Sequence, residues 1–359
     1  MVNLHEIHFE ITNACPHNCL HCSTGMIEYE NVNTLLKAIT LSTIDQIAKI
    51  PGNPKVIHLT GGEPLCHNNI IDIVKYIKDC NIIPSVFTTG FAFKFDEKTR
   101  QKIVHAVDVN TLEKLAKAGL EEAVFSIHST RPEIHNEIMQ TQECLENELF
   151  AINKLVELGV KVKFNCVPMS LNRNYIEEVV KYAKDSGIKE VRFLRFVCQG
   201  NAVNNPRLYM NRKEMVETVQ SIVKLSERYT TKDFKVVSEG YPQYLKCRPF
   251  DFIEDGCQAG KSLVHINLNR DVLPCPAFKQ KKQYFAGNLR QDTLKDIWFN
   301  SPVFINLRHL TQSDLNNPCK MCPDYVGCYG GCVAQRSWSG EDIYHSPDPI
   351  CIKPEVIDV

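Results

Sequence analysis

The stretch EIHFEITNACPHNCLHC (6–22) decides what this chain folds into. Over residues 5–11, apolar and polar side chains alternate. One face of this run carries Ile7, Phe9 and Ile11. The opposite face carries Glu6, His8 and Glu10. A period of two predicts a β-strand. Three cysteines follow with the spacing Cys15-x3-Cys19-x2-Cys22, so the sequence predicts a strand whose end carries a loop with three thiols.

Further short apolar runs predict strands along the first two thirds of the chain. They lie near residues 56–60, 82–89, 122–128, 160–167 and 189–196. Helical periodicity occurs near residues 42–50, 67–80, 109–118, 144–158 and 173–186. Because helices with short links join the strands, the strands are expected to be parallel. Six such units fall short of the closed barrel of eight. We therefore expect an α/β fold, a partial (βα)6 TIM-like barrel.

The composition is that of a globular protein. The chain has 359 residues and a net charge of -1. This balanced charge gives no reason to expect nucleic acid or a membrane as a partner, and no apolar run reaches the roughly 18 residues of a membrane helix. The first residues do not form a secretory signal. We expect a cytoplasmic protein whose 16 cysteines bind metal or do redox work rather than form structural disulfides.

The pattern changes in the second half of the chain. Residues 1–200 are expected to form the barrel, and residues 201–245 a linker with a bridging helix near 212–228. Residues 246–359 are rich in Cys, Pro and Gly and poor in periodic structure, which indicates a second domain held together by bound metal rather than by a large core. The basic run KQKKQ (279–283) is expected to be a solvated loop.

The cysteines of the first loop suit an iron–sulfur cluster. Thiolates are the usual ligands of a [4Fe–4S] cube, and three of them leave the fourth iron without a ligand from this loop. Such an iron can bind a substrate or a cofactor. The loop also follows a strand end, where a βα barrel carries its active site. A zinc site and a redox Cys-x-x-Cys pair are the alternatives, and the third cysteine argues against both.

With Cys15, Cys19 and Cys22 in this arrangement, the chain resembles the radical S-adenosylmethionine (SAM) superfamily, in which such a loop holds the cluster. The resemblance implies that the open iron binds the amino and carboxylate groups of SAM. It also implies that one electron from the reduced cluster cleaves SAM to a 5′-deoxyadenosyl radical. That radical then removes a hydrogen atom from the substrate.

Further motifs match the same family in order. The motif GGEP follows the second strand, where the family binds the SAM amino group. Its residues are Gly61, Gly62, Glu63 and Pro64. The resemblance places Ser126 near the SAM carboxylate or ribose. Asn165 on the fifth strand is a further SAM-binding candidate, and a polar cap of the strand end explains it equally well.

A second group of cysteines lies near the C-terminus. The stretch CKMCPDYVGCYGGC (319–332) fits a zinc knuckle when it is taken alone. The whole pattern resembles the SPASM domain, an extension of some radical SAM enzymes that binds two auxiliary [4Fe–4S] clusters. The resemblance assigns the outer cluster to Cys319, Cys322, Cys328 and Cys351. It assigns the inner cluster to Cys257, Cys275 and Cys332.

Some positions qualify this second resemblance. Residues 287–308 resemble the linking helix of that domain, with Trp298 as a packing anchor. The family usually has Gly where this chain has Arg270, so Asn269 is expected to supply the left-handed turn. The fourth ligand of the inner cluster is left open between Cys247 and an open site. The remaining cysteines are expected to be small buried apolar residues: Cys66, Cys80, Cys144, Cys166 and Cys198.

Relatives with a SPASM domain mostly modify peptides or protein side chains. We therefore expect a peptide maturase that forms a thioether or carbon–carbon cross-link in a ribosomally made precursor peptide. The expected partners are that peptide and a reductant such as flavodoxin or ferredoxin. Because the chain begins almost at the first strand, the leader is expected to be bound by the barrel or by a separate leader-binding protein. The expected cofactors are SAM and three [4Fe–4S] clusters, about twelve irons.

Other activities stay open. One is formylglycine formation of the anaerobic sulfatase-maturase type, although relatives of that type carry Asp where this chain has Pro276. The other is oxidation or decarboxylation of a small metabolite. A non-catalytic iron–sulfur carrier would need neither an open iron nor GGEP, which disfavours that class. No residue is assigned as the catalytic acid or base.

Overall fold

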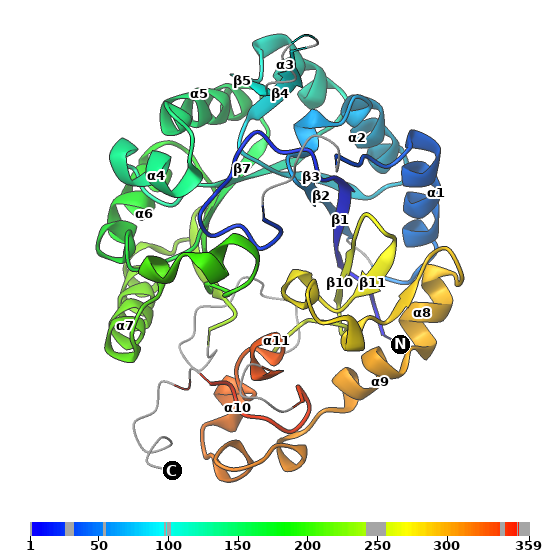
Figure 1. Ribbon diagram of the computed structural model, residues 1–359, viewed down its shortest axis with the longest axis vertical. Helices are drawn as coiled ribbons and strands as arrows, with labels where there is room; N and C mark the ends of the chain where they lie inside the picture. Colours follow the sequence, from blue (N-terminus) through cyan, green and yellow to red (C-terminus); the bar gives the residue numbers. More distant parts are fainter. Residues whose placement is uncertain are drawn as a thin grey trace.

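The computed structural model describes residues 2–25, 32–52, 55–96, 98, 102–241, 256–337, 342–349 and 351. A ten-stranded sheet with the order β12-β11-β10-β1-β2-β3-β6-β7-β8-β9 curves inside a ring of helices (Figure 1). Six of its strands are β1 Glu6–Thr12, β2 Val56–Gly61, β3 Ile83–Thr88, β6 Glu122–Ser126, β7 Lys161–Cys166 and β8 Glu190–Leu194. Each of these pairs in parallel with its neighbour, which confirms the predicted partial barrel.

The helices that link these strands cover the outer face of the sheet (Figure 1). They are α1 Lys37–Ala48, α2 Ile70–Asp79, α3 Val109–Lys117, α4 Pro132–Met139, α5 Cys144–Glu157, α6 Ile176–Asp185 and α7 Arg212–Tyr229. All but α4 lie close to a predicted helix. Their apolar sides pack on Ile7, Phe9, Ile11 and the equivalent residues of the other strands, which are fully buried. The polar side chains of the same strands therefore face the barrel interior.

The sheet extends beyond the predicted strands at both edges. β9 (Lys235–Glu239) pairs in parallel with β8, and β10 (Leu263–Ile266) pairs in parallel with β1. β11 (Asp271–Leu273) and β12 (Gly287–Asn288) continue the sheet in antiparallel fashion. The cysteine-rich part of the chain is thus joined to the barrel by backbone hydrogen bonds.

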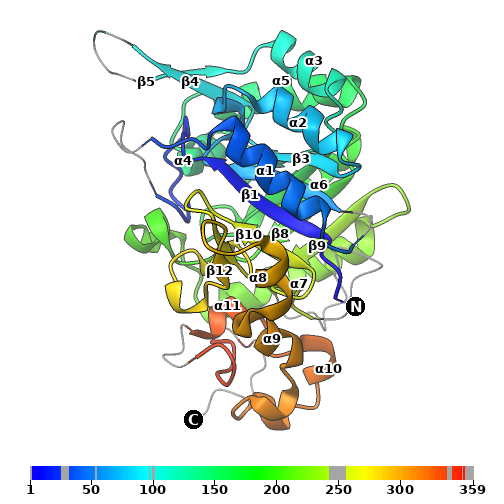
Figure 2. The same ribbon diagram turned by 90° about the vertical axis from the view of Figure 1, so that its right-hand side faces the viewer.

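A hairpin that was not predicted follows β3. Its strands are β4 (Phe91–Phe95) and β5 (Lys102–Ala106), which form a separate antiparallel sheet. Figure 2 shows this hairpin projecting past the carboxyl ends of the barrel strands. It therefore enlarges the face of the barrel that carries the first cysteine loop.

The region expected to be one linking helix is two helices. α8 (Leu294–Asn300) ends before Ser301, and α9 begins at the next residue and spans Pro302–His309. Proline has no amide hydrogen, so it suits a first helical turn and breaks a continuous helix. Trp298 is fully buried in the main core, and its indole Nε1 donates to the carbonyl of Val2 at 3.3 Å, as expected of a packing anchor.

Shorter helical elements complete the chain. Two four-residue helices are α10 Tyr325–Cys328 and α11 Val333–Arg336. The 3-10 turns are η2 Pro64–Cys66, η3 Arg173–Tyr175, η4 Gly200–Asn204, η5 Pro206–Leu208, η7 Pro276–Phe278, η8 Lys282–Tyr284, η9 Gln312–Asp314 and η10 Cys319–Met321. In the described ranges no helix combines the length and the apolar composition needed to cross a bilayer.

The turn between β10 and β11 corrects one expectation. Arg270 itself, rather than Asn269, adopts the left-handed conformation, with φ +66°. Its amide donates to the carbonyl of Asn267 at 2.8 Å, so the tight turn fixes the conformation at this position. Glycine would adopt it without the steric cost that a Cβ atom brings.

Arg270→Gly is therefore expected to stabilise the protein. Glycine removes the steric cost of the left-handed conformation, but it also has a greater entropy in the unfolded chain. The net increase in the free energy of unfolding is up to about 1 kcal/mol. Urea unfolding measures this difference. Arg270→Ala removes the same long side chain and keeps the Cβ atom, so it serves as the control. An equal gain in both variants would show that the side chain, and not the backbone, is responsible.

Candidate iron–sulfur and S-adenosylmethionine sites

The structure brings Cys15, Cys19 and Cys22 together in the loop after β1. The amide of Cys22 donates to the carbonyl of Cys19 at 3.1 Å. Burial raises the pKa of Cys19, and the neighbouring thiols of Cys15 and Cys22 raise it further. Burial likewise raises the pKa of Cys15 to about 12. A bound cation replaces the proton even on thiols with raised pKa values, because the cation stabilises the thiolate. Three adjacent sulfur donors therefore fit an iron–sulfur cluster.

A segment nearly 180 residues further along the chain holds this loop in place. The Asn201 amide donates to the carbonyl of Cys22, and its side-chain nitrogen donates to the carbonyl of Cys19, both at 2.9 Å. At Gly200 a Cβ atom would collide with the carbonyl oxygen of Cys22. From the other side, Lys102 of β5 donates to the carbonyl of Cys15 at 2.6 Å. Residues 201–211, expected to be a linker, thus also pack on the cysteine loop.

Two neutral histidines lie in and beside the loop. His17 contacts Thr141 at 2.7 Å and Thr89 at 2.9 Å, and burial lowers its pKa to about 3. The His21 ring packs edge-on against His128, with ring centres 4.3 Å apart. Burial lowers the pKa of His21 to about 4. The loop therefore carries uncharged imidazoles that fix its shape.

The backbone of the GGEP motif joins the cysteine loop directly. The Gly62 amide donates to the carbonyl of Thr12, and the Glu63 amide donates to the carbonyl of Ala14, both at 2.7 Å. A Cβ atom on Gly62 would collide with the carbonyl oxygen of Ala14, so this close approach requires glycine. Pro64 begins the turn η2. The two motifs thus form one unit at the ends of β1 and β2.

The side chain of Glu63 is used inside the protein. It is buried, and it accepts hydrogen bonds from the Thr88 hydroxyl at 2.7 Å and from the Thr89 amide and hydroxyl at 2.8 and 2.9 Å. A fourth bond comes from the amide of Leu65 at 3.1 Å. Burial raises the pKa of Glu63 to about 7, although these donors lower it. The carboxyl group therefore ties the end of β3 to the GGEP turn.

The elevated pKa of Glu63 predicts a pH dependence of stability. Between the ordinary glutamate value of about 4.5 and the folded pKa of about 7, the folded state binds more protons than the unfolded state. The contribution of this group to stability therefore falls as the pH rises through this window. Relative to Glu63→Gln, the wild type is expected to lose stability between pH ~5 and ~7 and to change little above it. Urea midpoints of both proteins at several pH values test this, and a constant difference would contradict it.

Ser126 and Asn165 lie side by side at the barrel interior. They are register partners on β6 and β7, and both side chains are half-buried. The Asn165 Oδ1 is buried and accepts no hydrogen bond in the described part of the chain. A buried acceptor without a donor is costly unless a ligand supplies one. This pair therefore fits the polar part of a cofactor such as SAM.

Further ionisable side chains also face the barrel interior. His8 and Glu10, whose orientation the sequence left open, point inward. Lys279 pairs with Glu10, and His265 of β10 lies 3.3 Å from the same carboxylate. Although burial alone would raise it, these two neighbours hold the pKa of Glu10 well below its usual range. The run 279–283 is thus not simply a solvated loop, because its first lysine reaches into the barrel.

The C-terminal cysteines gather in two groups. Burial raises the pKa of Cys275, and the nearby thiols of Cys257 and Cys332 raise it further. In the second group, the pKa of Cys319 is raised by burial and by Cys351 and Cys322, and that of Cys328 by burial and by Cys351 and Cys319. These groups have the same members as the inner and outer sets expected from the resemblance. Cys247, the candidate fourth inner ligand, lies outside the described residues.

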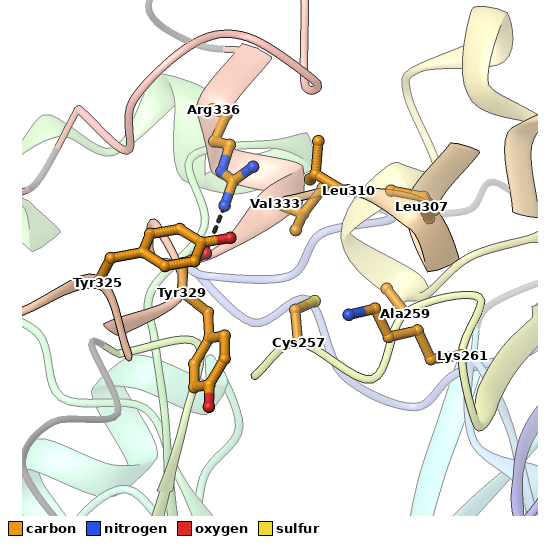
Figure 3. A pocket seen from close by; sticks show the side chains of 9 residues that line it. All are labelled: Cys257, Ala259, Lys261, Leu307, Leu310, Tyr325, Tyr329, Val333 and Arg336. Carbon is orange, nitrogen blue, oxygen red and sulfur yellow. Dashed lines mark hydrogen bonds between the residues drawn. The ribbon is translucent and has the colours of Figure 1, made fainter. Parts of the chain in front are cut away.

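A small cavity adjoins the inner group (Figure 3). Its volume is about 30 Å³, and Cys257, Lys261, Tyr325 and Arg336 are among its lining residues.

The Arg336 guanidinium donates to the carbonyl of Tyr329 at 2.6 Å and to that of Gly330 at 3.0 Å. The turn between Cys328 and Cys332 is therefore held by a buried arginine.

A buried ion pair connects this turn to the barrel. Arg195, just after β8, donates to Asp348 through both terminal nitrogens, one of them at 2.7 Å. Asp348 in turn accepts from the amide of Cys332 at 2.9 Å. Nothing in the sequence around these two residues indicated the pair, since 153 positions separate them.

The other cysteines follow the expectation in part. Cys144 and Cys166 are fully buried, as expected of small apolar residues. The other three are only half-buried: Cys66, Cys80 and Cys198. Burial raises the pKa of Cys66 in η2, and the nearby thiol of Cys15 raises it further. Sequence reasoning missed this neighbour because 51 positions separate the two residues.

Comparisons with known proteins follow the same division of the chain. The Radical SAM superfamily profile matches residues 9–195, and that of the SPASM iron–sulfur cluster-binding domain matches residues 257–323. The AdoMet-dependent heme synthase of Methanosarcina barkeri is 24% identical over 357 residues, 96% of this chain and 95% of that protein. The PqqA peptide cyclase of Methylocella silvestris is 23% identical over 345 residues, 95% of this chain and 86% of that protein.

Solved structures show the same fold. Streptococcus suis SuiB bound to S-adenosylmethionine superposes with a TM-score of 0.74 at 18% identity, over 98% of this chain and 77% of SuiB. The protein anSMEcpe with bound AdoMet superposes with a TM-score of 0.70 at 15% identity, over 96% of this chain and 90% of anSMEcpe. With the three-cysteine loop at the end of β1 and the profile matches across both halves, the chain belongs to the radical SAM superfamily and carries a C-terminal SPASM domain.

Proposed function

We propose that this chain is a maturase that forms a thioether or carbon–carbon cross-link in a ribosomally made precursor peptide. Relatives along nearly its whole length include several PqqA peptide cyclases. One of the structures with the same fold is SuiB bound to its precursor peptide SuiA. The observation that carries the proposal is the arrangement of thiols, one group at the barrel strand ends and two in the SPASM region.

In this proposal Cys15, Cys19 and Cys22 hold the first [4Fe–4S] cluster. When cluster and SAM are bound, they supply a 5′-deoxyadenosyl radical that removes a hydrogen atom from the substrate. The backbone of residues 61–64 and the side chains of Ser126 and Asn165 would contact SAM. The neutral imidazoles beside the loop and the Glu63 hydrogen bonds keep these groups in position. Positioning of this kind is the protein's main contribution to cofactor chemistry.

The SPASM region, proposed as residues 246–359 after a bridging segment 201–245, would hold the other two clusters. The outer ligands are Cys319, Cys322, Cys328 and Cys351. The inner ligands are Cys257, Cys275 and Cys332, with Cys247 or an open site as the fourth. Forming one cross-link removes two hydrogen atoms from the peptide. One would be taken up as a hydrogen atom by the radical that SAM supplies, and the other would leave as a proton and an electron, which an auxiliary cluster held by these cysteines could accept.

The experiment is anaerobic incubation of the reconstituted enzyme with SAM, a flavodoxin or ferredoxin reductant, and the short peptides encoded beside its gene. The expected product is a peptide lighter by two hydrogen atoms, with fragment ions missing between the joined residues. Tandem mass spectrometry thereby separates a cross-link from formylglycine, which leaves the fragment series complete. Pro276 already disfavours formylglycine formation.

A second candidate is oxidation or decarboxylation of a small metabolite, which the heme synthase relative supports. Unchanged peptide mass together with turnover of a porphyrin carboxylate would replace the first proposal with this one.

A separate protein that binds the leader can be tested by co-purification. The precursor peptide should then co-purify with the enzyme only when that protein is present.

A further inference from the structure

A cluster of two histidines and a glutamate lies in the barrel, away from the cysteine loop. Glu6 and His8 are two positions apart on β1, so both point inward, and His58 is the register partner of His8 on β2. All three are buried. Glu6 lies six positions before Thr12, so roughly 20 Å of extended strand separates it from the cysteine loop.

The donor atoms of these residues are spaced for a metal ion. His8 Nε2 lies 2.8 Å and His58 Nε2 lies 3.5 Å from the same oxygen, Oε1 of Glu6. One donor atom from each residue lies within 4.8 Å of the others. Ligands that share one tetrahedral cation at about 2.0–2.2 Å are separated by similar distances. Two histidines and one glutamate are also a known zinc ligand set.

The His58 ring is fixed in the orientation that a ligand needs. Its Nδ1 contacts the buried hydroxyl of Ser85 at 2.8 Å, which leaves Nε2 facing the carboxylate. The Phe87 ring stacks on His58 with ring centres 4.5 Å apart. A partner on the second ring nitrogen is typical of histidines that bind metal, because it sets the tautomer and the ring direction.

The carboxylates of the barrel interior differ in the partners that lie within ion-pair distance of them. Glu10 pairs with Lys279, and Glu122 pairs with Lys161 and Lys163. Both Glu190 and Glu239 pair with Arg192 at 2.8 Å. Across the described residues, the ion pairs of Glu6 are with His8 and His58. At ion-pair distance this carboxylate therefore faces imidazoles, and the charge of Arg192 acts on it from further away.

We propose that Glu6, His8 and His58 bind a divalent transition-metal ion of the zinc type, in addition to the cysteine sites. The three protein ligands leave a fourth position for water or for a group of the substrate. The site does not depend on the proposed peptide chemistry. The alternative occupant of the same place is a proton on one imidazole, and a metal-binding experiment distinguishes the two.

The test uses cluster-loaded protein and Zn²⁺ as the probe. After anaerobic reconstitution and exposure to Zn²⁺ against a competing chelator, about one zinc per chain is expected to remain. X-ray absorption should show nitrogen and oxygen neighbours at about 2.0–2.2 Å rather than sulfur at about 2.3 Å, the distance of a cysteine site. Loss of the zinc during chelator competition, or a sulfur shell alone, would overturn the proposal.

Variants locate the site. His58→Ala and Glu6→Gln are expected to abolish zinc retention while the iron content stays unchanged. Ser85→Ala removes only the partner of His58 and is expected to weaken zinc binding by roughly 10–100-fold. His105→Ala on the exposed strand β5 is the matched control and is expected to retain the metal. Equal zinc retention in all four variants would place the metal elsewhere and refute the proposal, even if one variant folds poorly.

Discussion

Replacement of Cys15, Cys19 and Cys22 together by alanine is expected to abolish release of 5′-deoxyadenosine from SAM and to lower the iron content by about four per chain. The physical reason is that these three half-buried cysteines form a set of soft donors at the end of β1, where backbone hydrogen bonds join the chain to the GGEP turn. The measurement is anaerobic incubation with SAM and a strong reductant, with iron and sulfide analysis of the same sample.

Cys66→Ala is the matched control for this experiment. Cys66 is half-buried and near Cys15, but it belongs to η2 rather than to the loop. If the fourth iron is open to SAM, this variant keeps both the iron and the deoxyadenosine release. A loss as large as that of the triple variant would mean that Cys66 closes the fourth corner, and SAM binding at that iron would then be refuted.

Arg195→Ala is expected to destabilise the protein by about 3–5 kcal/mol, because it leaves the carboxylate of Asp348 buried without its cation. Both residues are more than 90% buried, so solvent compensates little for the loss of the guanidinium charge. Since Asp348 also accepts from the Cys332 amide, the variant should in addition lower the iron content of the SPASM region. Urea unfolding and iron analysis of the anaerobically reconstituted protein measure the two effects.

The exposed pair Arg207 and Glu137, 2.6 Å apart, provides the comparison. Surface pairs of this kind contribute between about 0 and 1 kcal/mol, so Arg207→Ala should change the unfolding midpoint little. If Arg195→Ala were as mild as Arg207→Ala, the buried pair would not fasten the C-terminal segment to the barrel. Asp348→Asn, which keeps the size of the side chain, separates loss of charge from loss of packing.

The regular part of the barrel could be predicted because its signals are local. The alternation around Phe9 and the helical periodicities are contained in short stretches of sequence, and the observed elements lie within a few residues of them. β9 to β12 were missed because each is five residues or shorter and takes its stability from a neighbour far along the chain. The strands of the hairpin β4–β5 are close in sequence, and they were missed because each is only five residues long.

The candidate site divides in the same way. Cysteine spacing was sufficient to group the thiols, because ligands of one cluster recur at short intervals. The residues that hold those loops were not predictable. Asn and Lys are residue types common on protein surfaces, and only the fold places Asn201 against Cys19 and Lys279 against Glu10. His58 likewise lies about fifty positions after Glu6 and His8, and only the register of β1 and β2 places it beside them.

The pairing of β1 with β10 also affects how the chain is made. During synthesis Leu263–Ile266 emerge from the ribosome about 250 residues after β1. At about 5–20 residues per second, that edge waits roughly 13–50 s for its neighbour. Throughout this interval the edge of β1 lacks its neighbour beside the cysteine loop, so a chaperone or early iron delivery would protect the nascent chain at this stage.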